Sequence, residues 1–264
     1  ANKGYITRVD MTVEQAAIAK DVYFLNYFPV VNRAKLTSAV RLVFDAAAKD
    51  RDGKSLNSEV AKGPNRLNDL LTILLRFRRY RFALSADVSE MFLRVRMAEK
   101  DKQYHRFWWK DEIWQWDRII FGEGSSPDIS QKVVDIHAEK CKQAMELSAN
   151  VVMKERYMDD IITSVHSKSE CLELVRDIPR IFAGIDMVIQ KFYCNCPEAL
   201  KVMKPELVSS KVSFEEKDTV YESSKVLGMV WHAGSDKLSY STKYQNLSEY
   251  LKTLGYEEEQ MQSE

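Results

Sequence analysis

Carboxylates set among apolar residues are the part of the sequence best suited to chemistry. Asp159 and Asp160 are adjacent in a Tyr-Met-Asp-Asp tetrapeptide at 157–160, which Ile161 and Ile162 follow directly. Adjacent like charges repel each other, and burial disfavours the ionised form of both carboxyl groups. A bound cation relieves that repulsion, and Mg²⁺ takes oxygen ligands from one or two carboxylates together with substrate phosphates. The pair therefore indicates a divalent-metal site.

Asp87 is a third carboxylate in a similar setting, within Ser-Ala-Asp-Val at 85–88. Three carboxylates from neighbouring strands can hold two cations about 3.5–4 Å apart, the arrangement for in-line phosphoryl transfer. One ion would activate an attacking 3′-hydroxyl group, and the other would bind a triphosphate and stabilise the leaving pyrophosphate. The alternative is structural, since aspartates commonly cap helices or form turns. The apolar residues on both sides of 159–160 argue against that alternative.

Predicted strands position these carboxylates. Residues 82–95 predict a strand that ends in a turn of helix, and 151–165 predict a hairpin with Asp159 and Asp160 at its tip. The remaining pattern predicts helices over 13–19, 67–77, 125–148 and 169–182, strands over 26–31, 41–45, 187–193, 219–221 and 225–231, and a hairpin over 108–120 that turns at 110–112. Short strands and helices without a regular βαβ alternation favour an α+β fold.

Composition narrows the class of protein. The chain is 45% hydrophobic and has only 9 Gly and 6 Pro, which excludes a mainly disordered or collagen-like chain. No apolar run approaches the roughly 18 residues that span a bilayer, and no signal-peptide pattern is visible. We therefore expect an intracellular protein, in a cytoplasmic particle or the nucleus. The net charge is zero, yet residues 31–110 carry 18 Lys and Arg against 9 Asp and Glu. This basic half suits a nucleic acid or a triphosphate.

Cysteines and histidines do not form a recognisable metal-ligand pattern. The spacing of Cys141, Cys171, Cys194 and Cys196 fits no zinc site, so we expect free, buried or half-buried thiols in a reducing compartment. The four histidines are scattered through the sequence, and we expect each to be structural or exposed.

In combination, these motifs resemble reverse transcriptases. The tetrapeptide at 157–160 is similar to the catalytic hairpin of that family, and Asp87 with Phe92 five residues later resembles its first catalytic strand. Further segments resemble other parts of the family in the same order: the triphosphate-contacting finger strand at 41–45, the short motif at 55–57, the loop and helix start at 121–127, the segment after the catalytic hairpin at 184–191, and the primer grip at 227–231.

The stretch 63–87 resembles the BEL/Pao type of LTR retrotransposon, and the overall resemblance covers roughly residues 25–235. It implies a right-hand polymerase fold with fingers and palm, and no thumb is recognisable. The domains it implies are an N-terminal extension over 1–24, mostly fingers over 25–84, a palm over 85–235 with a fingers insertion at about 97–125, and a C-terminal segment over 236–264 that leads toward a missing thumb and is disordered at its end.

The resemblance implies an RNA- and DNA-templated DNA polymerase that uses two Mg²⁺ ions, or Mn²⁺. Its metal ligands would be Asp87, Val88, Asp159 and Asp160, and Lys191 would be the catalytic proton donor to pyrophosphate. The nucleotide would meet Arg41, Phe92, Phe121, Met158 and Lys35, with Phe92 as a steric gate against a 2′-hydroxyl group. Template and primer would meet Tyr157, Arg76, Arg78, Arg79, Gly122, Ser126, Leu227 and Gly228.

The expected partners are an RNA template, a DNA primer–template duplex and dNTPs, with other domains of a polyprotein or a host protein, but no membrane. One alternative is a domesticated reverse-transcriptase-like domain that acts as a non-catalytic RNA-binding or protein-interaction scaffold. An RNA-dependent RNA polymerase is a second alternative, which Phe92 disfavours because those enzymes usually need a polar residue at the gate.

Two positions near the nucleotide differ between members of the family. Glu123-Gly124 departs from the usual Leu-Thr, so an acidic side chain there either weakens template or nucleotide binding or points outward. Phe121 follows the retrotransposon pattern, whereas retroviral enzymes have Gln at this position.

Overall fold

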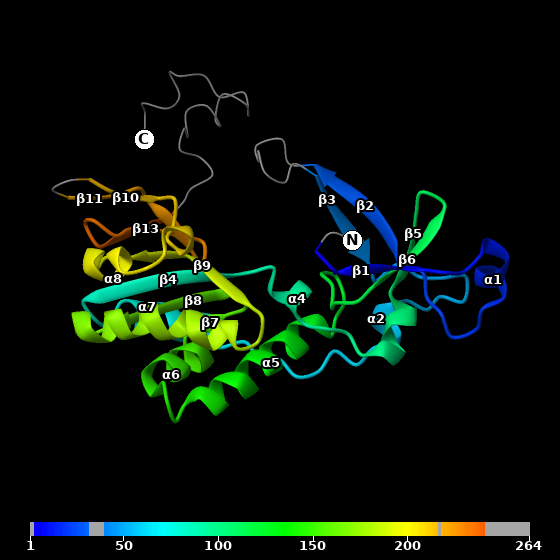
Figure 1. Cartoon of the computed structure of the whole chain (residues 1–264), viewed down its shortest axis with the longest axis horizontal. Helices are drawn as coiled ribbons and strands as arrows, with labels where there is room; N and C mark the ends of the chain where they lie inside the picture. Colours follow the sequence, from blue (N-terminus) through cyan, green and yellow to red (C-terminus); the bar gives the residue numbers. More distant parts are fainter. Residues whose placement is uncertain (1–2, 32–39, 216–217, 241–264) are drawn as a thin grey trace, which may run out of the picture.

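The computed structural model describes residues 3–31, 40–215 and 218–240. It has an α+β fold, as predicted, with two lobes that lie side by side along the long axis (Figure 1). The N-terminal lobe contains β1 to β3, β5 and β6, and the C-terminal lobe contains β4 and β7 to β14. Within the described residues, no helix is long and apolar enough to cross a membrane.

A four-stranded antiparallel sheet is the centre of the C-terminal lobe. Its strands lie in the order β7 (Arg156–Tyr157), β8 (Asp160–Val165), β4 (Phe82–Ser89) and β9 (Val188–Cys194). Strands β4 and β8 pair from Phe82↔Val165 to Asp87↔Asp160. β4 continues into the short helix α4 (Met91–Arg94), which confirms the predicted strand with a terminal turn of helix.

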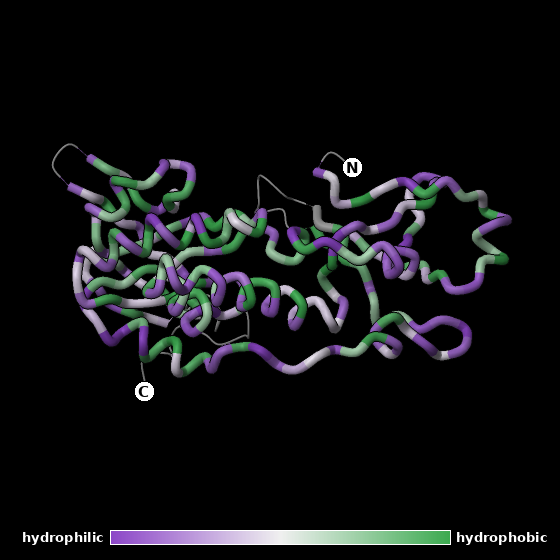
Figure 2. Tube along the Cα trace, turned by 60° about the horizontal axis from the view of Figure 1, so that its bottom comes forward, coloured by the Kyte–Doolittle hydropathy of each residue, from purple (hydrophilic) through white to green (hydrophobic). Residues whose placement is uncertain are grey.

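Side chains alternate between the two faces of β4, as the two-residue period of a strand requires. Leu84, Ala86 and Val88 face a core that they share with the helices α5 (Ser126–Cys141), α6 (Glu146–Lys154) and α7 (Lys168–Ala183). Figure 2 shows hydrophobic and hydrophilic residues alternating at short intervals along the trace, as expected for elements with one buried face. The odd-numbered residues of β4, which include Asp87, therefore face the other side of the sheet.

The second face of the sheet is covered near one end by α3 (Leu70–Phe77) and a small sheet of β12 (Ser224–Val226), β13 (Met229–His232) and β14 (Lys237–Tyr240). Trp231 is fully buried there, and its ring packs edge-on against Phe77 at 4.9 Å and against Tyr193 at 5.1 Å between centroids. Ala83 of β4 belongs to the same cluster, whereas Asp87 lies beyond it. The carboxylate end of the sheet is therefore left accessible.

The N-terminal lobe has its own core, which includes Leu25, Phe44 and Phe107. Two sheets surround it, one of β2 (Asn26–Val31) and β3 (Val40–Asp45), the other of β1 (Ile6–Val9), β6 (Glu112–Trp116) and β5 (Arg106–Trp109). The short elements around these sheets are α1 (Val13–Ile18), α2 (Leu56–Glu59) and the 3₁₀ helix η1 (Glu99–Tyr104).

The remaining elements of the C-terminal lobe follow β9. They are α8 (Pro197–Lys201), the 3₁₀ helix η2 (Pro205–Leu207), β10 (Val212–Phe214) and β11 (Thr219–Tyr221).

Most predicted elements are present, and some boundaries are shifted. The hairpin of β5 and β6 turns at Lys110 and Asp111, both with positive φ, within the predicted turn. α3 starts at Leu70 rather than 67, because the Asp69 side chain accepts the N–H of Thr72 and caps the helix there. The four cysteines are free thiols, three buried and one half-buried, as predicted.

The predicted helix over 125–148 is wrong as a single element. α5 ends at Cys141 and α6 begins at Glu146, with Met145 in a non-helical conformation (φ −141°, ψ 57°). The break redirects the chain so that Ala149, Val151 and Val152 enter the core beneath the sheet. Because α6 continues to Lys154, the predicted first arm of the hairpin over 151–157 is mostly helical, and only the two-residue β7 pairs with β8.

Arg156 anchors this short hairpin to the helices. Its side chain is only 1% exposed, and burial lowers the pKa of its guanidinium while Asp135 acts to raise it. Nε donates to the Val152 carbonyl at 3.1 Å, one terminal nitrogen contacts Asp135 at 2.6 Å, and the other donates to the Met158 carbonyl at 3.2 Å and to Gln131. One buried cation thus joins α5, α6 and the hairpin turn.

We expect Arg156→Met to lower the free energy of unfolding by about 3 kcal/mol, since it leaves the buried carbonyl groups that it bonded without a donor. Urea unfolding of the full chain, followed by tryptophan fluorescence, measures this change. Lys168→Met is the matched control, because Lys168 and its partner Glu198 are both more than half exposed and such pairs contribute little. Equal destabilisation by the two substitutions would contradict an anchoring role for Arg156.

Candidate active site

Three aspartates meet at one end of the central sheet. The register places Asp87 directly opposite Asp160, on the side of the sheet away from the large helices. Asp159 lies in the turn between β7 and β8, where Met158 has a positive φ of 55°. The Val88 N–H donates to the Asp159 carbonyl at 2.8 Å, so that backbone contact fixes the turn against β4.

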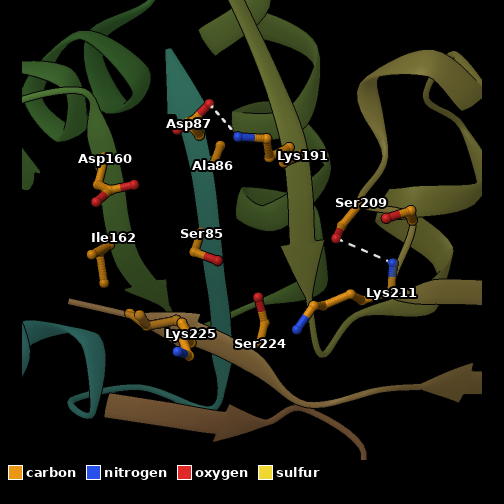
Figure 3. A pocket seen from close by; sticks show the side chains of 12 residues that line it. Ser85, Ala86, Asp87, Asp160, Ile162, Lys191, Ser209, Lys211, Ser224 and Lys225 are labelled. Atoms are coloured by element: carbon orange, nitrogen blue, oxygen red, sulfur yellow. Dashed lines mark hydrogen bonds and ion pairs between the residues drawn. The ribbon is translucent and has the colours of Figure 1, made fainter. Parts of the chain in front are cut away.

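The aspartates border two cavities. Asp87 and Asp159 line a cleft of about 810 Å³ that also includes Val43 and Phe44 of β3 and Phe121 from the loop before α5. This cleft lies between the two lobes. Asp87 and Asp160 line a smaller pocket of about 290 Å³ next to β9 and β12 (Figure 3). Asp87 is therefore common to both cavities.

Lys191 is aimed at Asp87 by an irregularity in β9. The pairing of β4 and β9 shifts register between Ser85 and Asp87, and Lys191 has a left-handed φ of 57°. Bulges of this kind redirect a side chain within a sheet. The Lys191 ammonium group contacts Asp87 Oδ1 at 2.9 Å, as the dashed line in Figure 3 shows. This positive charge partly neutralises the aspartate group.

The carboxylates disfavour one another's ionisation. Burial raises the pKa of Asp160 to about 6, with further contributions from Asp159 and Asp87, and Lys191 acts in the opposite direction. The pKa of Asp159 is also raised, chiefly because the protein around its side chain replaces solvent and then because of Asp87. A site with this charge balance favours a cation.

The donor atoms suit a hard cation such as Mg²⁺, because all three side chains offer carboxylate oxygens. Among the described residues, however, no group of three or more His, Cys, Asp or Glu side chains stands close enough together to enclose a metal ion. Asp87 turns toward Lys191 instead. The residues thus fit the chemistry of a divalent cation, and their side chains are not drawn together in this structure.

The two aromatic residues predicted at the nucleotide lie against each other. Phe121 is 56% exposed and lines the cleft, whereas Phe92 is 8% exposed and belongs to the core under the sheet. Their ring centroids are 4.8 Å apart, so Phe92 supports the ring that the cleft exposes. Met158 instead packs against the core, and its sulfur contacts the Gln131 amide at 3.6 Å.

Two further residues were predicted to contact the nucleotide, Arg41 and Lys35, and two to contact template or primer, Gly122 and Ser126. Arg41 lies on β3 in register with Val30, and Lys35 lies outside the described residues. Gly122 has φ +95°, and a Cβ atom there would meet the Phe44 carbonyl oxygen at 2.6 Å, so the loop requires glycine at this position. Ser126 is fully buried as the first residue of α5.

The arginines at and just after the C-terminal end of α3 already have partners within the protein. Arg78 makes a two-pronged contact with the Asp236 carboxylate, at 2.6 and 3.0 Å. Arg76 donates to the Lys154 carbonyl at 2.9 Å, and Arg79 stacks over the Tyr80 ring at 4.9 Å. Arg76 and Arg78 therefore connect α3 to its neighbours in this structure, and a role in binding template stays a prediction.

The predicted primer side lies close to the aspartates. Leu227 and Gly228 form the turn between β12 and β13 with positive φ angles, and the preceding residues Lys225 and Val226 line the small pocket with Asp87. Tyr157 is half-buried against the Trp231 cluster.

Sequence reasoning missed several polar residues of the small pocket. Figure 3 shows Lys211, Lys225 and nearby serines of the β9–β12 region around it. Lys211 donates to the Ser223 carbonyl, and its backbone N–H contacts Ser209 Oγ at 3.3 Å. No spacing signal could have found these residues, because they are more than 100 positions away from Asp87 in the chain. Only the fold brings them together.

Comparison with solved structures reveals the same fold in foamy virus protease–reverse transcriptase. One structure, in complex with an RNA/DNA hybrid, aligns with a TM-score of 0.59 at 17% identity, covering 96% of this chain and 28% of that one. Two structures in complex with double-stranded DNA align with TM-scores of 0.60 and 0.58, also at 17% identity over 96% of this chain. The chain spans between 28% and 44% of the length of these three proteins.

Comparison with curated proteins finds no match. The sequence profile of the reverse transcriptase (RNA-dependent DNA polymerase) family matches residues 35–196, which are well over half of the 264 residues. The matched segment contains Asp87, Asp159, Asp160 and Lys191, and it ends two residues after β9. From this match and the shared fold, the chain belongs to the reverse transcriptase family.

Proposed function

We propose that this chain is the polymerase part of a reverse transcriptase, which extends a primer 3′-hydroxyl group with deoxynucleotides on RNA or DNA templates. The observation that carries the proposal is the register of β4 and β8, which puts Asp87 opposite Asp160 and beside Asp159 at an open cleft. Asp87 and Asp159 at a cleft of about 810 Å³, with Asp160 paired to Asp87, match the needs of metal-assisted nucleotidyl transfer.

Two Mg²⁺ ions, with Mn²⁺ as a substitute, are the cofactors we infer for this site. Asp87, Asp159 and Asp160 would hold them, with Val88 next to Asp87. When bound, the ions supply activation of the attacking hydroxyl group and neutralisation of the triphosphate. The raised pKa of Asp160 supports this assignment, since a nearby cation would favour its ionised form.

The residues of the cleft would position the nucleotide. Arg41 belongs to β3, whose residues Leu42 to Phe44 line the cleft, and an Arg on this strand can bind a triphosphate through charge-assisted hydrogen bonds. The Phe121 ring, which also lines the cleft, offers an apolar surface to the sugar, and Phe92 packs against it. Lys191 lines both cavities, so its ammonium group can reach a leaving pyrophosphate and donate a proton.

We further propose a BEL/Pao-type retrotransposon as the origin of the chain, on the basis of the stretch 63–87. The division into fingers over 25–84 and palm over 85–235 is part of this proposal, as are an extension over 1–24 and a segment over 236–264 that leads toward a thumb. RNA, a DNA duplex and dNTPs are the partners we infer, and further domains of a polyprotein are consistent with the greater length of the foamy virus proteins.

We expect Asp159→Asn to reduce the rate of primer extension more than about a hundredfold. Substituting a residue that only supports a metal ligand typically costs about 10–100-fold in metal affinity or activity, and removing the ligand itself should cost more. The assay uses the full chain, Mg²⁺ or Mn²⁺, dNTPs and a self-priming hairpin template at low salt, which favours nucleic-acid binding. Asp186→Asn is the control, because this exposed aspartate has a left-handed φ of 56° that Asn tolerates well.

If the unaltered chain binds the hairpin and extends neither RNA nor DNA templates, the polymerase proposal is wrong. That outcome favours the non-catalytic scaffold.

We expect Phe92→Val to reduce the preference for dNTPs over rNTPs by about tenfold or more, because a smaller side chain removes a clash with the 2′-hydroxyl group. Incorporation kinetics with dCTP and rCTP measure the preference. Phe121→Val separates a direct from an indirect effect, since Phe92 contacts the exposed Phe121 ring. An unchanged sugar preference in Phe92→Val would remove Phe92 from the gate role.

We expect Lys191→Met to lower two quantities, the rate of extension and the Mg²⁺ concentration that extension requires. The rate of extension should fall by about a hundredfold if the ammonium group donates a proton to pyrophosphate. The Mg²⁺ concentration at half-maximal rate should fall several-fold, because the cation no longer competes with the ion pair to Asp87. A magnesium titration of the extension rate tests both, with Lys201→Met on the exposed end of α8 as control. A Mg²⁺ requirement equal to that of the unaltered chain would show that the ion pair does not compete.

A further inference from the structure

A buried histidine–glutamate pair fixes the loop that follows Phe121 of the cleft. His105 Nε2 and Glu123 Oε2 are 3.0 Å apart, and their side chains are 4% and 6% exposed. His105 follows η1 at the start of the β5 region, whereas Glu123 lies in the loop between β6 and α5. Of the two alternatives stated for Glu123, the outward-pointing side chain is wrong, because the side chain is buried, whereas weakened binding stays a prediction.

The pair has all of its polar groups satisfied. The other ring nitrogen, His105 Nδ1, lies 3.0 Å from the Asp101 carbonyl oxygen, and Glu123 Oε1 accepts from Ser125 Oγ at 2.6 Å. Both ring nitrogens thus lie within hydrogen-bond distance of a polar partner. Burial acts to raise the pKa of Glu123, but hydrogen bonds from His105 and Ser125 outweigh it and lower the pKa.

The loop that carries Glu123 forms a wall of the cleft. Ile120 and Phe121 line the cleft of about 810 Å³ together with Asp87 and Asp159. On the other side of the wall, Glu123 and His105 border a separate cavity of about 920 Å³. The pair therefore borders the second cavity, and Glu123 follows Phe121 of the cleft by only two residues in the same loop.

Two side chains from the N-terminal lobe hold this loop. The Asn57 amide donates to the Gly122 carbonyl at 2.9 Å and accepts from the Gly124 N–H at 2.7 Å. Glu123, between these two glycines, is held from the opposite direction by His105. Hydrogen bonds to Gly122, Glu123 and Gly124 are directional, so together they hold the loop in one conformation. An apolar side chain at position 123 would restrain the loop less specifically.

We propose that His105 and Glu123 are a positioning pair for nucleotide binding, which holds the Phe121 loop at the place where the incoming deoxynucleotide contacts the cleft. This inference rests on the proposed polymerase function. Neither residue contacts the reacting atoms. A buried polar pair of this kind is weak evidence for added stability. The directional hydrogen bonds of His105 and Glu123 better match a role in holding the loop in one conformation.

The first test is the kinetics of Glu123→Gln, which keeps the shape of the side chain and removes its charge. We expect the KM for dNTP to rise about tenfold, with kcat and the Kd for the hairpin template changing less than about twofold, because only nucleotide positioning is lost. Glu99→Gln is the matched control, since Glu99 lies on η1 and its side chain is 84% exposed. If the unaltered chain polymerises and Glu123→Gln has an unchanged KM, the inference is overturned while the proposed function stands.

A double-mutant cycle tests whether the two residues act together. His105→Leu and Glu123→Leu each leave one buried polar group without its partner, so each should raise the KM for dNTP. The double variant has no buried polar group without a partner at this position. Its KM for dNTP should therefore be closer to the KM of the unaltered chain than the KM of either single variant is. Additive effects would overturn the pairing. Should a single variant fail to fold, Ser125→Ala, which removes only one hydrogen bond to Glu123, takes its place with the same expected direction.

A measurement that does not depend on activity separates this inference from the proposed function. Amide hydrogen exchange of peptides covering 119–126 should be faster in Glu123→Gln, while peptides covering 156–163 exchange as in the unaltered chain. Unchanged exchange in 119–126 would show that the pair does not hold the loop, even if no polymerisation is detected. Faster exchange in the loop without any polymerisation by the unaltered chain would support the positioning and overturn the polymerase proposal.

Discussion

The antiparallel register of β4 and β8 is the constraint on which the site depends. In a strand, a shift by one residue moves every side chain to the opposite face. Leu84, Ala86 and Val88 are buried against the helices, so the hydrophobic core holds the register that leaves Asp87 on the open side. The same register pairs Asp87 with Asp160. The placement of the carboxylates is thus a consequence of burying the alternate residues.

Gathering carboxylates at one place opposes folding, and the structure offsets this in two ways. The irregularity in β9 directs Lys191 so that its ammonium group forms an ion pair with Asp87, while the Lys191 side chain stays exposed. Arg156 stabilises the hairpin turn from below, where its fully buried guanidinium group joins the turn to α5 and α6. The pKa of Asp160 is nevertheless raised to about 6, first by burial and then by the charges of Asp159 and Asp87. A cation in the site would relieve the repulsion between these carboxylates, so the same charges that oppose folding favour metal binding.

Local pattern was enough to predict the elements that carry the aspartates, because they have a clear period. β4, α3 and α7 follow alternation or helical spacing closely, and turn residues mark their ends. The break between α5 and α6 could not be predicted, since nothing between Cys141 and Glu146 forbids a helix. It exists because the core beneath the sheet accepts the α6 side chains only after the chain has turned. Tertiary packing decided the conformation there.

The site shows the same division between what sequence reveals and what the fold adds. Asp87, Asp159 and Asp160 could be named from their apolar surroundings, and the register then brought them together. Glu123 was unexpected from the sequence, because an acidic residue stands where the resembled family usually has Leu. Its partner His105, 18 positions earlier, showed no signal of its own, since a lone histidine has no spacing to recognise. The acidic residue at position 123 is therefore explained by its hydrogen bond to His105, which only the three-dimensional structure reveals. In this fold, Glu123 and His105 bury their polar side chains against each other.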